Sequence, residues 1–143
     1  MIVKAKPKDA YAAAKLAVQM WEHPIDALAA EFEETLRSSE DAMFLYMDQG
    51  MPIGFAHCSL RHDYVEGTDS SPVGYLEGVF VEETYRKQGV AKMLVEACES
   101  WAKEMGCVEF ASDCEIDNTA SLAFHLSIGF AEESRNIHFA KKL

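Results

Sequence analysis

A chain of 143 residues, 49% of them hydrophobic, is long enough to bury a core and too apolar to be a disordered protein. The net charge of -11 excludes nucleic acid as an expected partner and favours a polycationic one. No apolar run of about 18 residues is present, so no membrane span is predicted. The length predicts a single domain over residues 1–143. Because residues 1–10 lack a signal-peptide core, we expect the protein to be located in the cytoplasm.

The first half of the sequence predicts a strand, two helices and a two-stranded hairpin. Pro7 ends the strand, and His23 separates the helices because a residue that precedes a proline avoids helical geometry. Asp48-Gln49-Gly50 provides the residues of a hairpin turn. The expected ranges are 1–6 for the strand, 10–20 and 25–37 for the helices, and 42–47 and 52–59 for the hairpin strands.

The second half predicts alternating strands and helices after a polar loop over residues 61–72. Apolar residues at helical spacing follow a fourth strand and predict a long amphipathic helix, with Val90, Leu94, Ala97 and Trp101 on one stripe. Gly129 ends a later, shorter helix. The expected ranges are 75–81 for the fourth strand, 107–113 for a fifth, 120–127 for the short helix, and 130–135 and 136–141 for a closing hairpin.

The turn between the fourth strand and the long helix is basic and contains a glycine. Its residues are Arg86, Lys87, Gln88, Gly89, Val90 and Ala91. Backbone N–H groups at the start of a helix have no intrahelical partner and lie at the positive end of the helix dipole. Glycine lets an anion approach them closely, so this turn is a candidate cradle for a pyrophosphate.

The pattern R-x-x-G-x-A, placed between this strand and this helix, resembles the acyl-CoA-binding motif of the GCN5-related N-acetyltransferases (GNAT). The predicted order of strands and helices matches that fold from end to end. The resemblance implies an α/β (α+β) fold with a mixed, mostly antiparallel central sheet that splays between strands four and five. About four helices flank the sheet in such a fold.

The resemblance also implies acetyl-CoA as co-substrate and no metal. The backbone N–H of Val79 would polarise the thioester carbonyl, and Val81 would bond the pantetheine chain, with Phe80 between them. The segment 118–130 resembles a second signature of the family, in which Asn118 meets the pantetheine arm. His125 occupies the position where the family often has a tyrosine that protonates the leaving thiolate, and an imidazole can donate a proton near neutral pH.

Residues 54–81, with 21–24 and 111–113, resemble the aminoglycoside 6′-N-acetyltransferases of short chain length. That family implies direct attack of a primary amine on the thioester, with a polycationic aminoglycoside as acceptor and a homodimer formed through the C-terminal strands. Glu77 would hold the amine and relay its proton, and strict strand alternation puts it on the same face as Val79. The other implied acceptor-binding residues are Trp21, His23, Tyr64, Asp113 and, more weakly, Glu133.

Other interpretations remain open from the sequence. The acceptor could be a polyamine or a peptide N-terminus, or the chain could be a non-catalytic acyl-CoA-binding module. His57, His62 and Asp63 could form a metal site, although histidines in this arrangement without a closing cluster are more often hydrogen-bonded surface residues. His125 could be a structural helix residue, Asp113 a turn residue, and Trp21 a core residue.

Overall fold

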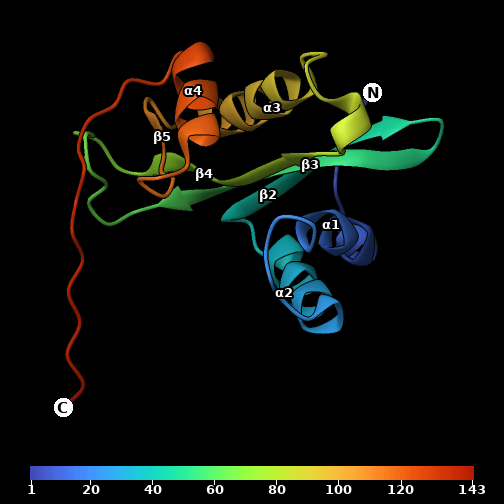
Figure 1. Cartoon of the computed structure of the whole chain (residues 1–143), viewed down its shortest axis with the longest axis horizontal. Helices are drawn as coiled ribbons and strands as arrows, with labels where there is room; N and C mark the ends of the chain where they lie inside the picture. Colours follow the sequence, from blue (N-terminus) through green and yellow to red (C-terminus); the bar gives the residue numbers. More distant parts are fainter.

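The computed structural model describes all 143 residues and contains one five-stranded sheet with helices on both faces (Figure 1). The strands lie in the order β1-β2-β3-β4-β5; the first four are antiparallel, and β5 runs parallel to β4. The sheet is therefore mixed and mostly antiparallel, as predicted. The strands are β1 (Ile2–Lys4), β2 (Asp41–Asp48), β3 (Met51–Arg61), β4 (Val73–Val81) and β5 (Phe110–Ser112).

The helices form two layers, with α1 and α2 on one face of the sheet and α3 and α4 on the other (Figure 1). In α3, Leu94, Cys98 and Trp101 are buried at helical spacing and pack on one side of the sheet. On the other side, Leu28 and Phe32 of α2 pack with Phe55 of β3. The helices are α1 (Ala10–Ala17), α2 (Ile25–Arg37), α3 (Val90–Glu104) and α4 (Thr119–Ser127), with short 3-10 turns η1 (Pro7–Asp9) and η2 (Glu83–Tyr85).

The β2–β3 turn adopts the geometry that its residues favour. Gln49 and Gly50 both have positive φ, at 49° and 78°, which matches the right-handed twist of the flanking strands in a tight hairpin. None of the helices is both long and apolar enough to cross a membrane.

A β-bulge interrupts the pairing of β3 with β4. His57 pairs with Gly78 and Cys58 pairs with Leu76, so Glu77 is the extra residue on β4. Leu76 and Val79 consequently both face α3, whereas strict alternation would put them on opposite faces. The prediction that Glu77 and Val79 share a face is therefore wrong, because the bulge shifts the alternation by one residue.

The sheet splays between β4 and β5, as expected. These strands pair only through Gly74, Tyr75 and Leu76, opposite Phe110, Ala111 and Ser112. The fifth strand is shorter than predicted, and β4 continues for five residues past the last pair, to Val81. The edge of β4 over residues 77–81 thus has no neighbouring strand on the β5 side.

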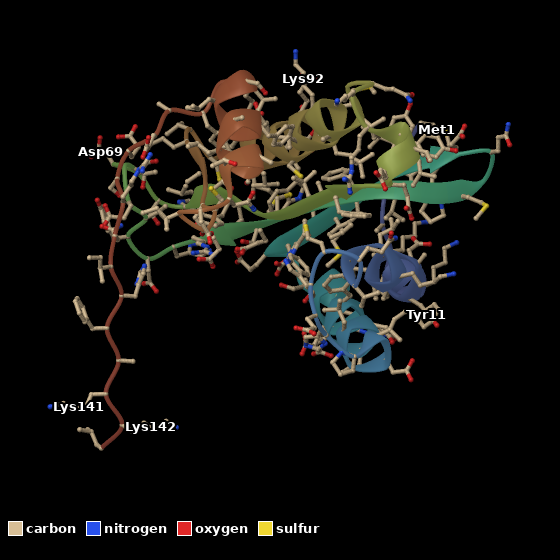
Figure 2. The ribbon with its side chains drawn as sticks, viewed as in Figure 1. Met1, Tyr11, Asp69, Lys92, Lys141 and Lys142 are labelled. Atoms are coloured by element: carbon tan, nitrogen blue, oxygen red, sulfur yellow. The ribbon has the colours of Figure 1, made fainter.

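The predicted closing hairpin is wrong: residues 130–143 form no regular secondary structure. After α4 the chain passes the β5 side of the sheet and then extends away from the domain (Figure 1). Ile137 and Phe139 alternate with polar residues as in a strand, yet 81% and 91% of their surfaces are exposed. The alternation is real, but no strand of the same chain lies beside this segment to pair with it. In Figure 2, Lys141 and Lys142 lie at its far end.

Candidate active site

The predicted anion cradle is built around Gly89, the residue immediately before α3. Gly89 has φ 81°, a left-handed conformation that residues other than glycine rarely adopt. A Cβ at this position would have no atom within 4 Å, so the space in front of the helix is open. No side chain caps α3, which leaves its first N–H groups available to an external anion.

The basic side chains of the cradle are not equally free. Arg86 donates from Nε to the carbonyl oxygen of Val81 at 2.8 Å and lies over the ring of Phe80, so it is held against the end of β4. Lys87 is exposed and has positive φ, at 62°. Lys92 extends outward from α3, 4.0 Å from Glu96 (Figure 2). Arg86 therefore positions the turn, and backbone N–H groups with Lys87 are the freest donors.

The residues present fit an extended acyl-CoA. The unpaired edge of β4 over residues 77–81 begins where β5 ends and leads to the cradle. It offers main-chain groups to an amide-containing chain such as pantetheine. Asn118 begins α4, where its Oδ1 accepts a bond from the backbone N–H of Ser121 at 3.1 Å. Its carbonyl is thus used as a helix cap, and its amide nitrogen is the group left for a ligand.

Glu77 lies in a hydrogen-bonded cluster rather than free in a cleft. The hydroxyl of Ser59 donates to Oε1 of Glu77 at 2.7 Å. Arg61 donates to the same oxygen through Nε at 3.2 Å and Nη2 at 3.0 Å, and to Oε2 through Nη2 at 3.0 Å. Both carboxylate oxygens are therefore engaged by a guanidinium in the ligand-free protein.

Asp113 belongs to the same cluster through Tyr75. The guanidinium of Arg61 lies 3.4 Å from the centroid of the Tyr75 ring, and the Tyr75 hydroxyl donates to Oδ2 of Asp113. Burial and this bond to Asp113 raise the pKa of Tyr75 well above its ordinary value, so Tyr75 stays a neutral donor. The structure thus brings Glu77 and Asp113 together around one arginine and one tyrosine.

Trp21 is placed beside the bulge by the glycine next to Glu77. A Cβ at Gly78 would lie 2.8 Å from two carbon atoms of the Trp21 ring, which is closer than real contacts allow. The ring also packs edge to face on Phe55, with centroids 6.2 Å apart. Gly78 therefore lets the indole lie directly against β4, so Trp21 is both a packing residue and a neighbour of Glu77.

Three other predicted acceptor-binding residues lie on loops or termini. His23 is exposed; its Nδ1 is 3.2 Å from the carbonyl oxygen of Pro24, and its Nε2 is 3.6 Å from Glu31. Tyr64 is exposed in the loop between β3 and β4. Glu133 lies against the same loop, because a Cβ at Gly67 would overlap its side chain. None of the three has a direct bond to Glu77 or Asp113.

His125 faces the end of β5 from α4. Its Nδ1 lies 2.7 Å from the carbonyl oxygen of Ser121, and a carbonyl only accepts, so Nδ1 carries the hydrogen. In the neutral ring Nε2 is then an acceptor, and the Ser112 hydroxyl donates to it at 2.8 Å. Ser112 also lies 3.3 Å from the carbonyl oxygen of Leu76, at the point where β4 and β5 separate.

The histidines proposed for a metal site are used elsewhere. Nε2 of His57 pairs with Asp41 at 2.9 Å, and Nε2 of His62 pairs with Glu40 at 2.9 Å. No group of three or more His, Cys, Asp or Glu side chains is placed to hold a metal ion. Two separate pairs account for these histidines: His57–Asp41 is half-buried, and His62–Glu40 is exposed.

Sequence reasoning missed Ser59, Arg61 and Ser112. The predicted third strand ended at Ser59, which put Arg61 in the loop, whereas β3 continues to Arg61. With the strand two residues longer, period-two alternation would have placed Arg61 on the face of Ser59, beside Glu77. Nothing in the sequence indicates that Ser112 meets His125, because that contact depends on how α4 packs.

The sequence is similar to known acetyltransferases over most of its length. The model of the Acetyltransferase (GNAT) family matches residues 9–130. The aminoglycoside N(6′)-acetyltransferase type 1 of Salmonella typhimurium is 47% identical over 125 residues, covering 87% of this chain and 86% of that protein. The enzyme of the same name from Stenotrophomonas maltophilia is 40% identical over 143 residues, covering 99% and 93%.

Three solved structures have the same fold as this protein over the whole length of the chain. AAC(6′)-Iy in complex with the bisubstrate analogue CoA-S-monomethyl-acetylneamine has a TM-score of 0.94 at 42% identity, covering 100% of this chain and 98% of that one. AAC(6′)-Iy with CoA has a TM-score of 0.95, covering 100% and 95%. The apo structure of AAC(6′)-IG from Acinetobacter haemolyticus has a TM-score of 0.94 at 35% identity, covering 100% and 99%.

Proposed function

Because the chain belongs to the acetyltransferase (GNAT) family, we propose that it transfers an acetyl group from acetyl-CoA to the 6′-amino group of aminoglycosides. The observation that carries this proposal is the proximity of two carboxylates, Glu77 and Asp113, around Arg61 and Tyr75. An acceptor with several ammonium groups matches two neighbouring carboxylates, whereas a monoamine needs only one. The similarity of the whole chain to aminoglycoside acetyltransferases supports the same acceptor class.

Glu77 binds the 6′-ammonium and takes part in removing its proton. An ammonium nitrogen has no lone pair, so one proton leaves before or during attack on the thioester carbonyl. Glu77, with Ser59 as a fixed hydrogen-bond donor, holds the amine, and the proton passes to solvent water. Asp113 binds a second amino group of the acceptor, and Trp21, His23 and Tyr64 line the ring-binding surface, with Glu133 at its margin.

The coenzyme side of the reaction is assigned to β4 and α3. Acetyl-CoA supplies the activated acyl group when bound. The backbone N–H of Val79 polarises the acyl carbonyl, the main chain of Phe80 and Val81 bonds pantetheine, and Asn118 contributes its amide. Such donors act where negative charge develops in the transition state. The cradle residues bind the pyrophosphate: Arg86, Lys87, Gln88, Gly89, Val90 and Ala91.

His125 and Ser112 deliver a proton to the leaving sulfur. The imidazolium form of His125 would donate from Nε2 to Ser112, whose hydroxyl can then turn its own hydrogen outward. As the C–S bond breaks, the sulfur takes the hydroxyl hydrogen of Ser112, and Ser112 takes the Nε2 hydrogen of His125. The acceptor nitrogen loses a second proton as the amide forms. Passed through water, this proton restores the imidazolium form of His125.

We further assign the protein to the cytoplasm, where acetyl-CoA is available, and to a homodimer. The extended segment 131–143 carries Ile137 and Phe139 in an unpaired, alternating arrangement. A second copy of the chain, pairing with this segment, would cover both side chains. Sedimentation analysis of the full chain and of a chain ending at Glu133 tests this: the full chain should be dimeric and the shortened chain monomeric.

An amine panel with acetyl-CoA tests the function directly, with release of free thiol as the readout. Neamine carries a 6′-amino group, and paromamine carries a hydroxyl in its place, so the two form a matched pair. We expect turnover on neamine, none on paromamine, and little on spermidine or a peptide N-terminus. Turnover confined to polyamines or peptides, or coenzyme binding without turnover on any amine, would reject the proposed acceptor.

A further inference from the structure

Arg61 occupies the place on Glu77 that an incoming ammonium group needs. It makes three bonds to the carboxylate, and the fourth bond comes from Ser59, so Oε1 accepts three bonds and Oε2 accepts one. A carboxylate offers about four acceptor positions, and a primary ammonium needs some of the positions that the guanidinium takes. Arg61 and a substrate amine therefore cannot both take their full set of bonds to this carboxylate.

Arg61 is held in a way that allows it to leave. It is the last residue of β3, and 42% of its side chain is exposed, compared with 26% for Glu77. Its other contact is the face of Tyr75, which it can leave without breaking a hydrogen bond. A partly exposed ion pair of this kind contributes modestly to stability, so displacement is within the reach of a bound polycation.

We propose that Arg61 is a specificity-determining residue: an internal cation that the 6′-ammonium of the acceptor displaces from Glu77. This inference rests on the proposed function. A 6′-ammonium repays the displacement by making its own charged bonds to Glu77, whereas a 6′-hydroxyl does not. Arg61 thus makes the site respond to charge at the reacting position, and it keeps Glu77 paired when no acceptor is bound.

Calorimetric binding of neamine and paromamine, in the presence of coenzyme A, tests the exchange. Arg61→Gln should tighten neamine binding by about three- to tenfold, because the competing cation is gone. Paromamine leaves Arg61 in place, so its affinity should change by less than about twofold. An equal change for both ligands would mean that Arg61 acts only through its long-range field, and weaker neamine binding would mean that Arg61 holds Glu77 in position; either result overturns the proposal.

Two further variants separate charge from geometry. Arg37→Gln removes one positive charge from the exposed Arg37–Glu33 pair on α2, so it should leave both affinities unchanged. Arg61→Lys keeps the charge but loses the two-nitrogen grip on Glu77, so it should tighten neamine binding by less than Arg61→Gln does.

The NMR signal of the Arg61 Nε–H provides a direct readout of displacement. It should move on adding neamine but not paromamine; an unmoved signal at saturating neamine contradicts displacement. If the wild-type protein binds neither ligand, the proposed function fails independently of Arg61.

Discussion

The conformation of Gly89 permits a sharp test of the anion cradle with two isosteric side chains. Gly89 has positive φ, and a Cβ attached to it would meet no atoms within 4 Å, so there is room for a side chain. Asparagine tolerates this backbone conformation best among larger residues, and a left-handed non-glycine residue costs about 1 kcal/mol of folding stability. Gly89→Asn and Gly89→Asp should both fold, and they differ chiefly in one negative charge.

The charge should decide coenzyme binding. An aspartate carboxylate about 4 Å from one phosphate charge is repelled by about 4 kcal/mol at an effective dielectric constant of about 20. Solvent screening at this exposed turn reduces that figure, so we expect Gly89→Asp to bind CoA about 100-fold more weakly than Gly89→Asn. The loss should shrink as salt concentration rises.

Titration calorimetry with CoA, at two salt concentrations, measures this difference, and circular dichroism verifies that both variants fold. Equal CoA affinity for the two folded variants would refute the assignment of the pyrophosphate to the start of α3. If Gly89→Asn already binds CoA much more weakly than the unmodified protein, steric exclusion by any side chain would explain the loss instead.

Three further predictions follow from the hydrogen-bonded groups. Glu77→Ala should lower kcat on neamine about 100-fold and leave CoA affinity unchanged, as steady-state kinetics and calorimetry would show; wild-type turnover would remove Glu77 from the chemistry. Ser112→Ala should lower kcat about tenfold and change its pH profile, whereas Ser121→Ala, which keeps the carbonyl bound by the imidazole, should not; equal effects would mean that Ser112 only packs. Bonds from Ser70 and from a backbone N–H lower the pKa of Glu109, so its ionised form stabilises the fold above its unfolded pKa of about 4.3 and loses that effect as pH falls. Glu109→Gln should therefore lower the Tm at pH 7, with the difference vanishing in acid; a difference that persists in acid would contradict the assignment.

Local sequence patterns predicted most of the fold because each element had its own local signals. The helix over residues 25–37 was predicted with the bounds that the structure shows, since Pro24 fixes its start and its apolar stripe fixes its face. The hairpin turn at Gln49-Gly50 and the start of the long helix at Val90 were correct for similar local reasons. The closing hairpin failed because strand pairing needs a neighbour, and residue alternation cannot show whether one exists within the chain.

The candidate site was predicted less completely, because it depends on contacts between elements. The cradle at Gly89 was predicted from its turn alone; Gly89 lies directly before α3 with positive φ, and its role in binding an anion stays a prediction. The partners of Glu77 were missed, since Arg61 lies 16 residues away in sequence and meets it only through strand pairing. The bulge at Glu77 left no signal in the composition of β4, so the face that Glu77 occupies could not be predicted either.

The bulge also determines which genetic changes this active site can tolerate. Side chains upstream of Glu77 in β4 follow one inside–outside parity, and those after it follow the opposite parity. A deletion of Glu77 would restore regular pairing: Gly78 and Val79 would keep their partners and faces, and only the extra position of the bulge would be lost. A substitution at Glu77 changes one side chain and keeps the bulge, whereas such a deletion would remove the position that holds a carboxylate beside Arg61 and leave the packing of β4 on α3 as it is. Natural variation in this strand should therefore proceed by replacement of residues at constant length.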